Sequence, residues 1–109
     1  MIRSGGSLLL RGLREETADF DLCVSKDLAD MLHLEQCRQD EYGSYVPFQD
    51  VQMTADLDLY SYDVIDGYQC ETLESILALK QRLMRPKDLR DIEAIEVRLR
   101  EMQNRDDLF

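Results

Sequence analysis

The segment Asp19–Val24 constrains the fold of this chain most, because carboxylate and apolar residues alternate along it. Successive side chains of a β-strand point to opposite faces, so Asp19 and Asp21 share one face of the predicted strand. The apolar residues between and after them share the other face. The pattern predicts a strand with a core face and a carboxylate face. Two carboxylates fixed in this way suit a hard cation such as Mg²⁺, which takes few protein ligands and completes its shell with water and phosphate oxygens.

A glycine pair precedes this strand, in the sequence Gly5-Gly6-Ser7. The pair predicts a tight turn, and Ser7 is a suitable N-cap for a short helix over Leu8–Leu13. Glycines let the backbone approach a ligand closely, and the amides at a helix start favour an anion. The alternative is a turn and a cap with no ligand. A phosphate site beside a metal site would indicate a nucleotide.

These residues resemble a known family. The glycine pair with Ser7, then Arg14, Thr17 and Asp19-Phe20-Asp21-Leu22, are similar to motifs of the nucleotidyltransferase superfamily that includes DNA polymerase β. The resemblance is closest to small bacterial members of the minimal, antibiotic-modifying, abortive-infection and toxin types. Two later runs, 73–80 and 85–92, resemble the C-terminal part of the same proteins.

The resemblance implies a fold of the α/β (α+β) class, with a mixed sheet of about four to five strands and helices packed mainly on one side. We expect one domain over residues 1–109, since a chain of this length supports a single core. Family members carry a helix and a first strand before the glycines, whereas this chain has only Met1–Ser4 there. The N-terminus is therefore expected to be abbreviated, with a short strand, a lost segment or a piece supplied by a partner.

The resemblance also implies a set of site residues. Asp19 and Asp21 would bind two Mg²⁺ ions, for which Mn²⁺ could substitute. A third carboxylate would come from a neighbouring strand, which the period-two pattern of Val51–Tyr60 predicts. Our choice is Asp58, with Asp56 as the alternative and Asp63 ranked lower. The nucleotide would contact Gly5, Gly6, Ser7, Arg14, Lys80 and Lys87.

The predicted function is Mg²⁺-dependent transfer of a nucleoside monophosphate from a nucleoside triphosphate to an acceptor hydroxyl, with release of pyrophosphate. The acceptor would be a small molecule, a protein or an RNA end, and the resemblance suggests a toxin–antitoxin or resistance setting. One alternative is a non-catalytic nucleotidyltransferase-like module that binds a partner such as an antitoxin; another is an enzyme that acts only as a homodimer. For Asp19 and Asp21, the simpler interpretation is that they are solvated residues on the outer face of an edge strand. For Lys80, Lys87 and the basic residues around them it is a solvated helix face and pairing with Asp88, Asp91 and Glu93.

The composition of the chain argues against several classes of partner, among them DNA, membranes and zinc. A formal net charge of −10 repels phosphate backbones, so nonspecific DNA binding is not expected. The apolar runs are too short for a membrane span, and no signal-peptide pattern begins the chain. Three scattered cysteines and one histidine fit free thiols better than a zinc site. We expect a cytoplasmic protein.

The remaining pattern predicts hairpins and helices. Gly43 and the Asp66-Gly67 pair mark two hairpin turns. A helix is expected to begin near Ser25, with Leu28, Met31 and Leu32 on its inner face. Thr72 would cap a further helix and Pro86 would start the last one.

Overall fold

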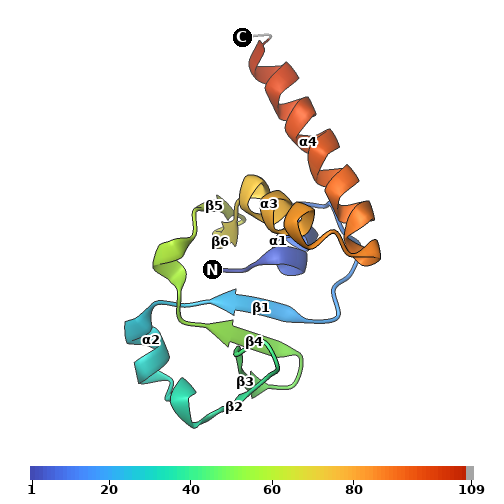
Figure 1. The fold of residues 1–109 in the computed structure, drawn as a ribbon. Helices are drawn as coiled ribbons and strands as arrows, with labels where there is room; N and C mark the ends of the chain where they lie inside the picture. The colour runs from blue at the N-terminus through green and yellow to red at the C-terminus, as the bar shows by residue number, and fades with distance from the viewer. Residues whose placement is uncertain (108–109) are drawn as a thin grey trace. The chain divides into compact units, whose positions relative to one another are not determined.

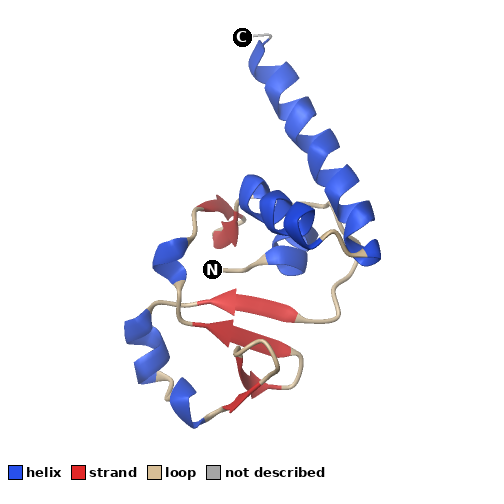
Figure 2. Ribbon diagram, viewed as in Figure 1, coloured by secondary structure: helices blue, strands red, loops and turns tan. Residues whose placement is uncertain are grey.

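The computed structural model describes residues 1–107 and shows the expected α+β fold (Figures 1 and 2). The chain divides into two compact units, Met1–Thr72 and a second that begins at Leu73. The helices are α1 Ser4–Leu10, α2 Lys26–Met31, α3 Leu73–Leu83 and α4 Leu89–Asp107, with short 3-10 helices at Leu34–Gln36, Leu57–Leu59 and Pro86–Asp88. The strands are β1 Phe20–Cys23, β2 Arg38–Gln39, β3 Tyr45–Phe48, β4 Val51–Thr54, β5 Tyr62–Ile65 and β6 Tyr68–Glu71.

The main sheet has the order β1-β4-β3-β2. Strands β1 and β4 run in parallel, with Phe20 opposite Val51 and Asp21 opposite Gln52, and Figure 1 shows the two arrows side by side. The other neighbours are antiparallel. Both predicted hairpins are present, and their glycines Gly43 and Gly67 each adopt φ near +84°, a left-handed conformation that favours glycine.

Residues 1–3 join the main sheet to the β5–β6 hairpin. Ile2 bridges Leu22 of β1 on one side and Cys70 of β6 on the other. The Ile2 N–H donates to the Gln69 carbonyl at 2.8 Å, and the Arg3 N–H donates to the Asp21 carbonyl at the same distance. Residues 1–3 thus form a short first strand that pairs on both sides through single bridges.

Helix α1 begins earlier than predicted. The glycine pair and Ser7 lie inside its first turns and are buried, so the prediction of a turn followed by a helix over Leu8–Leu13 was wrong. Ser7 does not cap the helix, because its hydroxyl donates to the Glu71 carbonyl at 2.9 Å. The helix ends at Leu10, and Gly12 follows with φ of +75°, as is common just after a helix C-terminus.

Strand β4 is shorter than the period-two pattern predicted. It ends at Thr54, and residues 57–59 form a 3-10 helix. The Leu57 N–H donates to the Val24 carbonyl at 3.3 Å, which turns the chain around the end of β1. Asp56 and Asp58 therefore do not share a strand face, and that prediction was wrong.

The helices of the N-terminal unit cover the apolar face of the sheet. A methyl group on Gly6 of α1 would meet the Phe20 ring at 3.4 Å. Ala29 of α2 packs in a buried cluster with Val24 and Leu34. Ser25 caps α2 as predicted, accepting from the Leu28 N–H at 3.1 Å. The predicted inner face of α2 was wrong, because its three large apolar residues are exposed: Leu28, Met31 and Leu32.

The C-terminal unit is a helix pair with a buried ion cluster. Pro86 stands at the first position of a 3-10 helix that leads directly into α4, so the expected start is confirmed. The Lys80 ammonium lies 3.3 Å from Asp88 Oδ1 and 3.1 Å from Asp91 Oδ2, and all three side chains are buried. No helix within residues 1–107 is long and apolar enough to cross a membrane.

Candidate active site

Asp21 lies at the centre of the polar face of the sheet. It is half-buried on β1, between Arg3 of the first short strand and Gln52 of β4. Burial raises the pKa of the Asp21 carboxyl, and the Arg3 guanidinium acts against this rise. Three neighbouring carboxylates add to the rise: those of Asp19, Asp40 and Glu71. Asp21 thus lies in surroundings that would favour an added cation.

Arg3 is a cation that acts on Asp21, and its guanidinium is shared between two carboxylates, those of Asp21 and Glu71. Its Nε lies 3.6 Å from Glu71 Oε1, and its guanidinium carbon lies 4.3 Å above the centre of the Tyr60 ring. The Glu71 side chain is 1% exposed and also accepts from the Ser4 N–H at 3.1 Å. Glu71 therefore fixes both Arg3 and the start of α1. Because Arg3 serves two carboxylates, it neutralises Asp21 only in part.

Four residues come together where the loop before β1 meets helix α1: Gly5, Arg14, Thr17 and Asp19. A Cβ atom on Gly5 would collide with the Arg14 guanidinium and would lie 2.7 Å from the Thr17 hydroxyl. The Thr17 hydroxyl in turn donates to the Asp19 carbonyl at 2.9 Å. The loop between α1 and β1 thus folds over the helix at Gly5, where a larger residue would displace the Arg14 guanidinium. Three predicted site residues, Gly5, Arg14 and Asp19, are brought together here.

The other two residues of the glycine motif make packing contacts. A Cβ atom on Gly6 would lie 2.7 Å from a methyl group of Ile2, which shows how closely α1 approaches the first strand. The Ser7 hydroxyl is fully buried and is turned toward the Glu71 carbonyl. Phosphate contact by Gly6 and Ser7 stays a prediction.

The three candidates for the third carboxylate have separate surroundings. The Cys23 thiol donates to Asp56 Oδ1 at 2.9 Å. Burial would raise the pKa of the Asp56 carboxyl, but hydrogen bonds from Cys23 and Thr54 hold it below its usual value. Asp63 pairs with Arg11 at 2.8 Å. The side chain of Asp58 lies outside the described part of the structure, so its role as third ligand stays a prediction.

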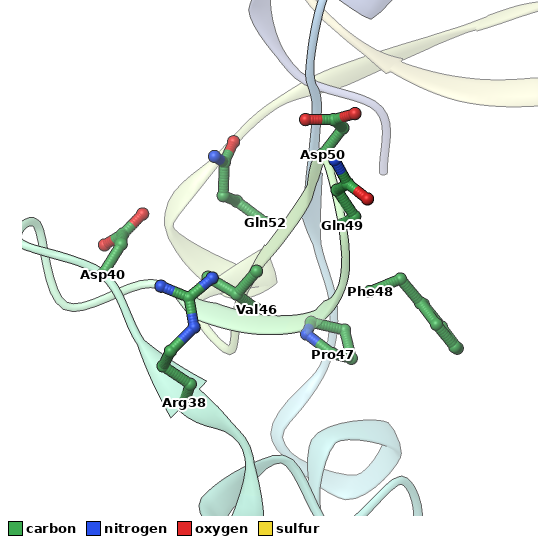
Figure 3. Close-up of a pocket in the computed structure, with 8 residues that line it drawn as sticks. All are labelled: Arg38, Asp40, Val46, Pro47, Phe48, Gln49, Asp50 and Gln52. Atoms are coloured by element: carbon green, nitrogen blue, oxygen red, sulfur yellow. The ribbon is translucent and has the colours of Figure 1, made fainter.

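A polar pocket of about 410 Å³ lies on the β3–β4 side of Asp21 (Figure 3). Gln52, which pairs with Asp21 in the β1–β4 register, lines it, and so does Asp40, whose charge acts on Asp21. The sequence pattern did not predict this pocket, because most of its residues lie before Val51, in a stretch to which we assigned no functional residue. The complete lining consists of Arg38, Asp40, Val46, Pro47, Phe48, Gln49, Asp50 and Gln52.

Lys80 and Lys87 belong to the C-terminal unit. Lys80 is 5% exposed and is held by Asp88 and Asp91. Lys87 is exposed on the 3-10 helix that precedes α4. Nucleotide contact by either lysine stays a prediction.

The donor set around Asp21 is compatible with Mg²⁺. Asp19 and Asp21 offer carboxylate oxygens, and one or two protein carboxylates are what a Mg²⁺ ion carrying phosphates usually uses. Among the described residues, no group of three or more His, Cys, Asp or Glu side chains is arranged to hold a metal ion. A metal here would therefore need oxygens from water or substrate.

No family model, curated protein or solved structure significantly matches this chain.

Proposed function

We propose that this protein is a Mg²⁺-dependent nucleotidyltransferase, which transfers a nucleoside monophosphate from a nucleoside triphosphate to an acceptor hydroxyl and releases pyrophosphate. The supporting observation is that Arg14 and Thr17 lie against Gly5, and that Thr17 donates to the Asp19 carbonyl, in the loop that leads to the half-buried Asp21. Phosphoryl transfer depends mainly on positioning and charge neutralisation, and this group of residues offers both.

Each residue has a role that follows from its contacts. The Arg14 guanidinium lies against Gly5, where it would bind phosphate oxygens, and the Thr17 hydroxyl holds the loop by donating to the Asp19 carbonyl. Asp19 and Asp21 would hold the metal, and the Arg3 guanidinium lowers the pKa of the Asp21 carboxyl against the effect of burial. Bound Mg²⁺ would neutralise the triphosphate and lower the pKa of the acceptor hydroxyl. We propose a small molecule, a protein or an RNA end as the acceptor, in a cytoplasmic setting that suits the three free thiols.

One observation favours a second candidate function, a non-catalytic module that binds a partner such as an antitoxin. Gln52, an amide, pairs with Asp21 at the neighbouring strand position where a further carboxylate would complete a metal site. Asp56 and Asp63 are engaged by Cys23 and Arg11. Such a module would fold without turning over nucleotide.

Thermal unfolding with each of the four nucleoside triphosphates, with and without Mg²⁺, tests the proposal. We expect at least one triphosphate to stabilise the protein only when Mg²⁺ is present, because a ligand that binds the folded state alone adds about 2.7 kcal/mol at a hundredfold excess over its Kd. Asp21→Asn should abolish this stabilisation. The matched control is Asp30→Asn on α2, where the carboxylate is exposed and remote from the polar face; it should retain the effect in full.

Two outcomes would contradict the proposal. The first is a folded protein that no triphosphate stabilises, which would favour the partner-binding module. The second is equal stabilisation of wild type and Asp21→Asn, which would place the nucleotide elsewhere. Pyrophosphate release in the presence of candidate acceptors then separates an enzyme from a protein that only binds nucleotide.

A further inference from the structure

The pocket lies next to the proposed metal ligand Asp21. Gln52, which pairs with Asp21 in the β1–β4 register, lines the pocket, and so does Asp40, whose charge acts on the Asp21 carboxyl. Neighbouring strands are about 4.8 Å apart, so a nucleotide whose phosphates are held at Asp21 needs to cross only one strand spacing to place its base over Gln52.

The Asp40 carboxylate that lines the pocket is held in place. Asp40 Oδ1 accepts from the Tyr42 N–H and the Ser44 N–H, both at 2.9 Å, so the carboxylate is fixed by the hairpin backbone. A carboxylate has about four acceptor positions, which leaves acceptor capacity for a ligand. Figure 3 shows the polar ends of Arg38, Asp40 and Gln52 gathered on one side of the hairpin, while the Phe48 ring points away from them.

This combination of groups matches one nucleobase. Guanine carries two adjacent donors, N1–H and the 2-amino group, beside the acceptor O6. A fixed carboxylate can accept from the two donors, and an arginine or a glutamine amide can donate to O6. Adenine, cytosine and uracil have no such pair of adjacent donors. A cavity of about 410 Å³ is also within the range of small-ligand sites.

We propose that the pocket lined by Arg38, Asp40 and Gln52 binds the base of the nucleotide and selects guanine. This inference rests on the proposed nucleotide-binding function and adds base specificity to it. Asp40 accepts from N1–H and the 2-amino group of guanine, and Arg38 donates to O6. Gln52 lines the pocket and lies beside Asp21 in the β1–β4 register, so the pocket adjoins the proposed metal ligand.

Isothermal titration calorimetry of the full chain tests the inference with four probes, each with Mg²⁺: GTP, ATP, ITP and inorganic triphosphate. ITP lacks only the 2-amino group of GTP. We expect GTP to bind about tenfold or more tighter than ATP, with ITP between them, as for loss of one good base contact. Asp40→Asn keeps an oxygen for the two backbone N–H groups but places a donor toward the base. It should remove the GTP preference and leave the affinity for inorganic triphosphate unchanged.

Two further variants complete the design. Glu41→Gln removes the adjacent exposed carboxylate, which does not line the pocket, and should retain the GTP preference. Arg38→Met removes the proposed donor to O6 and should also reduce the preference, so the test does not depend on Asp40→Asn alone.

The outcomes separate this inference from the proposed function. If all triphosphates bind with equal affinity, or if Asp40→Asn weakens GTP and inorganic triphosphate equally, the base site is wrong while nucleotide binding stands. If no nucleotide and no inorganic triphosphate binds in the presence of Mg²⁺, both proposals are wrong.

Discussion

Asp21 and Asp88 are the same residue type in two regions of the molecule, yet their surroundings shift the pKa values of their carboxyls in opposite directions. Hydrogen bonds from Arg85, against the effect of burial and with a further contribution from Lys80, lower the pKa of Asp88 to about 2. Burial raises the pKa of Asp21, and Arg3 offsets this only in part. Neighbouring residues of the protein thus fully compensate the negative charge of Asp88, whereas they compensate that of Asp21 only in part.

The difference indicates which carboxylate serves structure and which is available for a ligand. Asp88 is 1% exposed, and both of its oxygens accept hydrogen bonds from the C-terminal unit. Asp21 remains half-buried among like charges, which is an arrangement more common at binding and catalytic sites than in structural ion pairs. Three substitutions test this contrast through the stability of the folded state.

Removing Lys80 should have the largest effect. Lys80→Met takes the ammonium from Asp88 and Asp91 and leaves two buried carboxylates with less compensation. Breaking a buried ion pair in this way costs about 3–5 kcal/mol. Urea unfolding at pH 7 measures the loss. Lys87→Met, at an exposed position in the same unit, should change the unfolding free energy by less than about 0.5 kcal/mol. Equal stability of the two variants would show that the buried cluster contributes nothing.

Asp88→Asn should have an intermediate effect that depends on pH. At pH 7 the loss is about 2 kcal/mol, in the range for hydrogen bonds to a charged group. Since the folded-state pKa lies below the ordinary 3.8, the wild-type advantage is present above 3.8 and disappears as the pH falls toward about 2. Urea midpoints of both proteins from pH 7 to pH 2.5 should therefore converge on the acid side. A difference that stays constant over this range would contradict the assignment of the stabilisation to the ionised carboxylate.

Asp21→Asn should have the smallest effect, and one of opposite sign. Burial disfavours the charge of Asp21, so an uncharged isostere should raise the unfolding free energy at pH 7 by about 0.5–1 kcal/mol. Arg3 keeps Glu71 as its partner in this variant. The same urea titration measures the gain. A loss as large as that of Asp88→Asn would mean that Asp21 is a structural residue like Asp88, and that its position in a candidate site is coincidental.

The local patterns predicted much of the fold. Alternation placed Asp21 on a strand whose other face carries the apolar residues, glycine identified both hairpin turns, and Ser25 and Pro86 identified helix starts. These features depend on backbone preferences that a few neighbouring residues determine. The prediction of a turn at the glycine pair was wrong because contacts distant in sequence decide it. Glu71 accepts from both Ser4 and Ser7, and this places the pair inside α1.

The candidate site was predictable only in part, for a related reason. Gly5, Arg14 and Asp19 lie within one short stretch, and their meeting requires only that the loop folds back on its helix. Gln52 lies beside Asp21 through strand pairing, and Asp40 acts on the Asp21 carboxyl from a segment distant in sequence; no local pattern contains either relation. Strand β4 ends at Thr54 although the alternation continues to Tyr60, because the Leu57 N–H bonds back to the Val24 carbonyl and turns the chain away.

The placement of Ile2 between β1 and β6 has a consequence for the order of folding. The Ser4–Glu71 hydrogen bond, beside the Ile2 bridge, joins residues 67 positions apart. The main sheet can therefore form from nearby segments first, while the attachment of the β5–β6 hairpin must wait for a long loop to close. Contacts so distant in sequence slow folding, because loop-closure entropy is lost before the contact forms. A ribosome that pauses before residue 71 would hold a chain whose first strand still lacks one of its two neighbours.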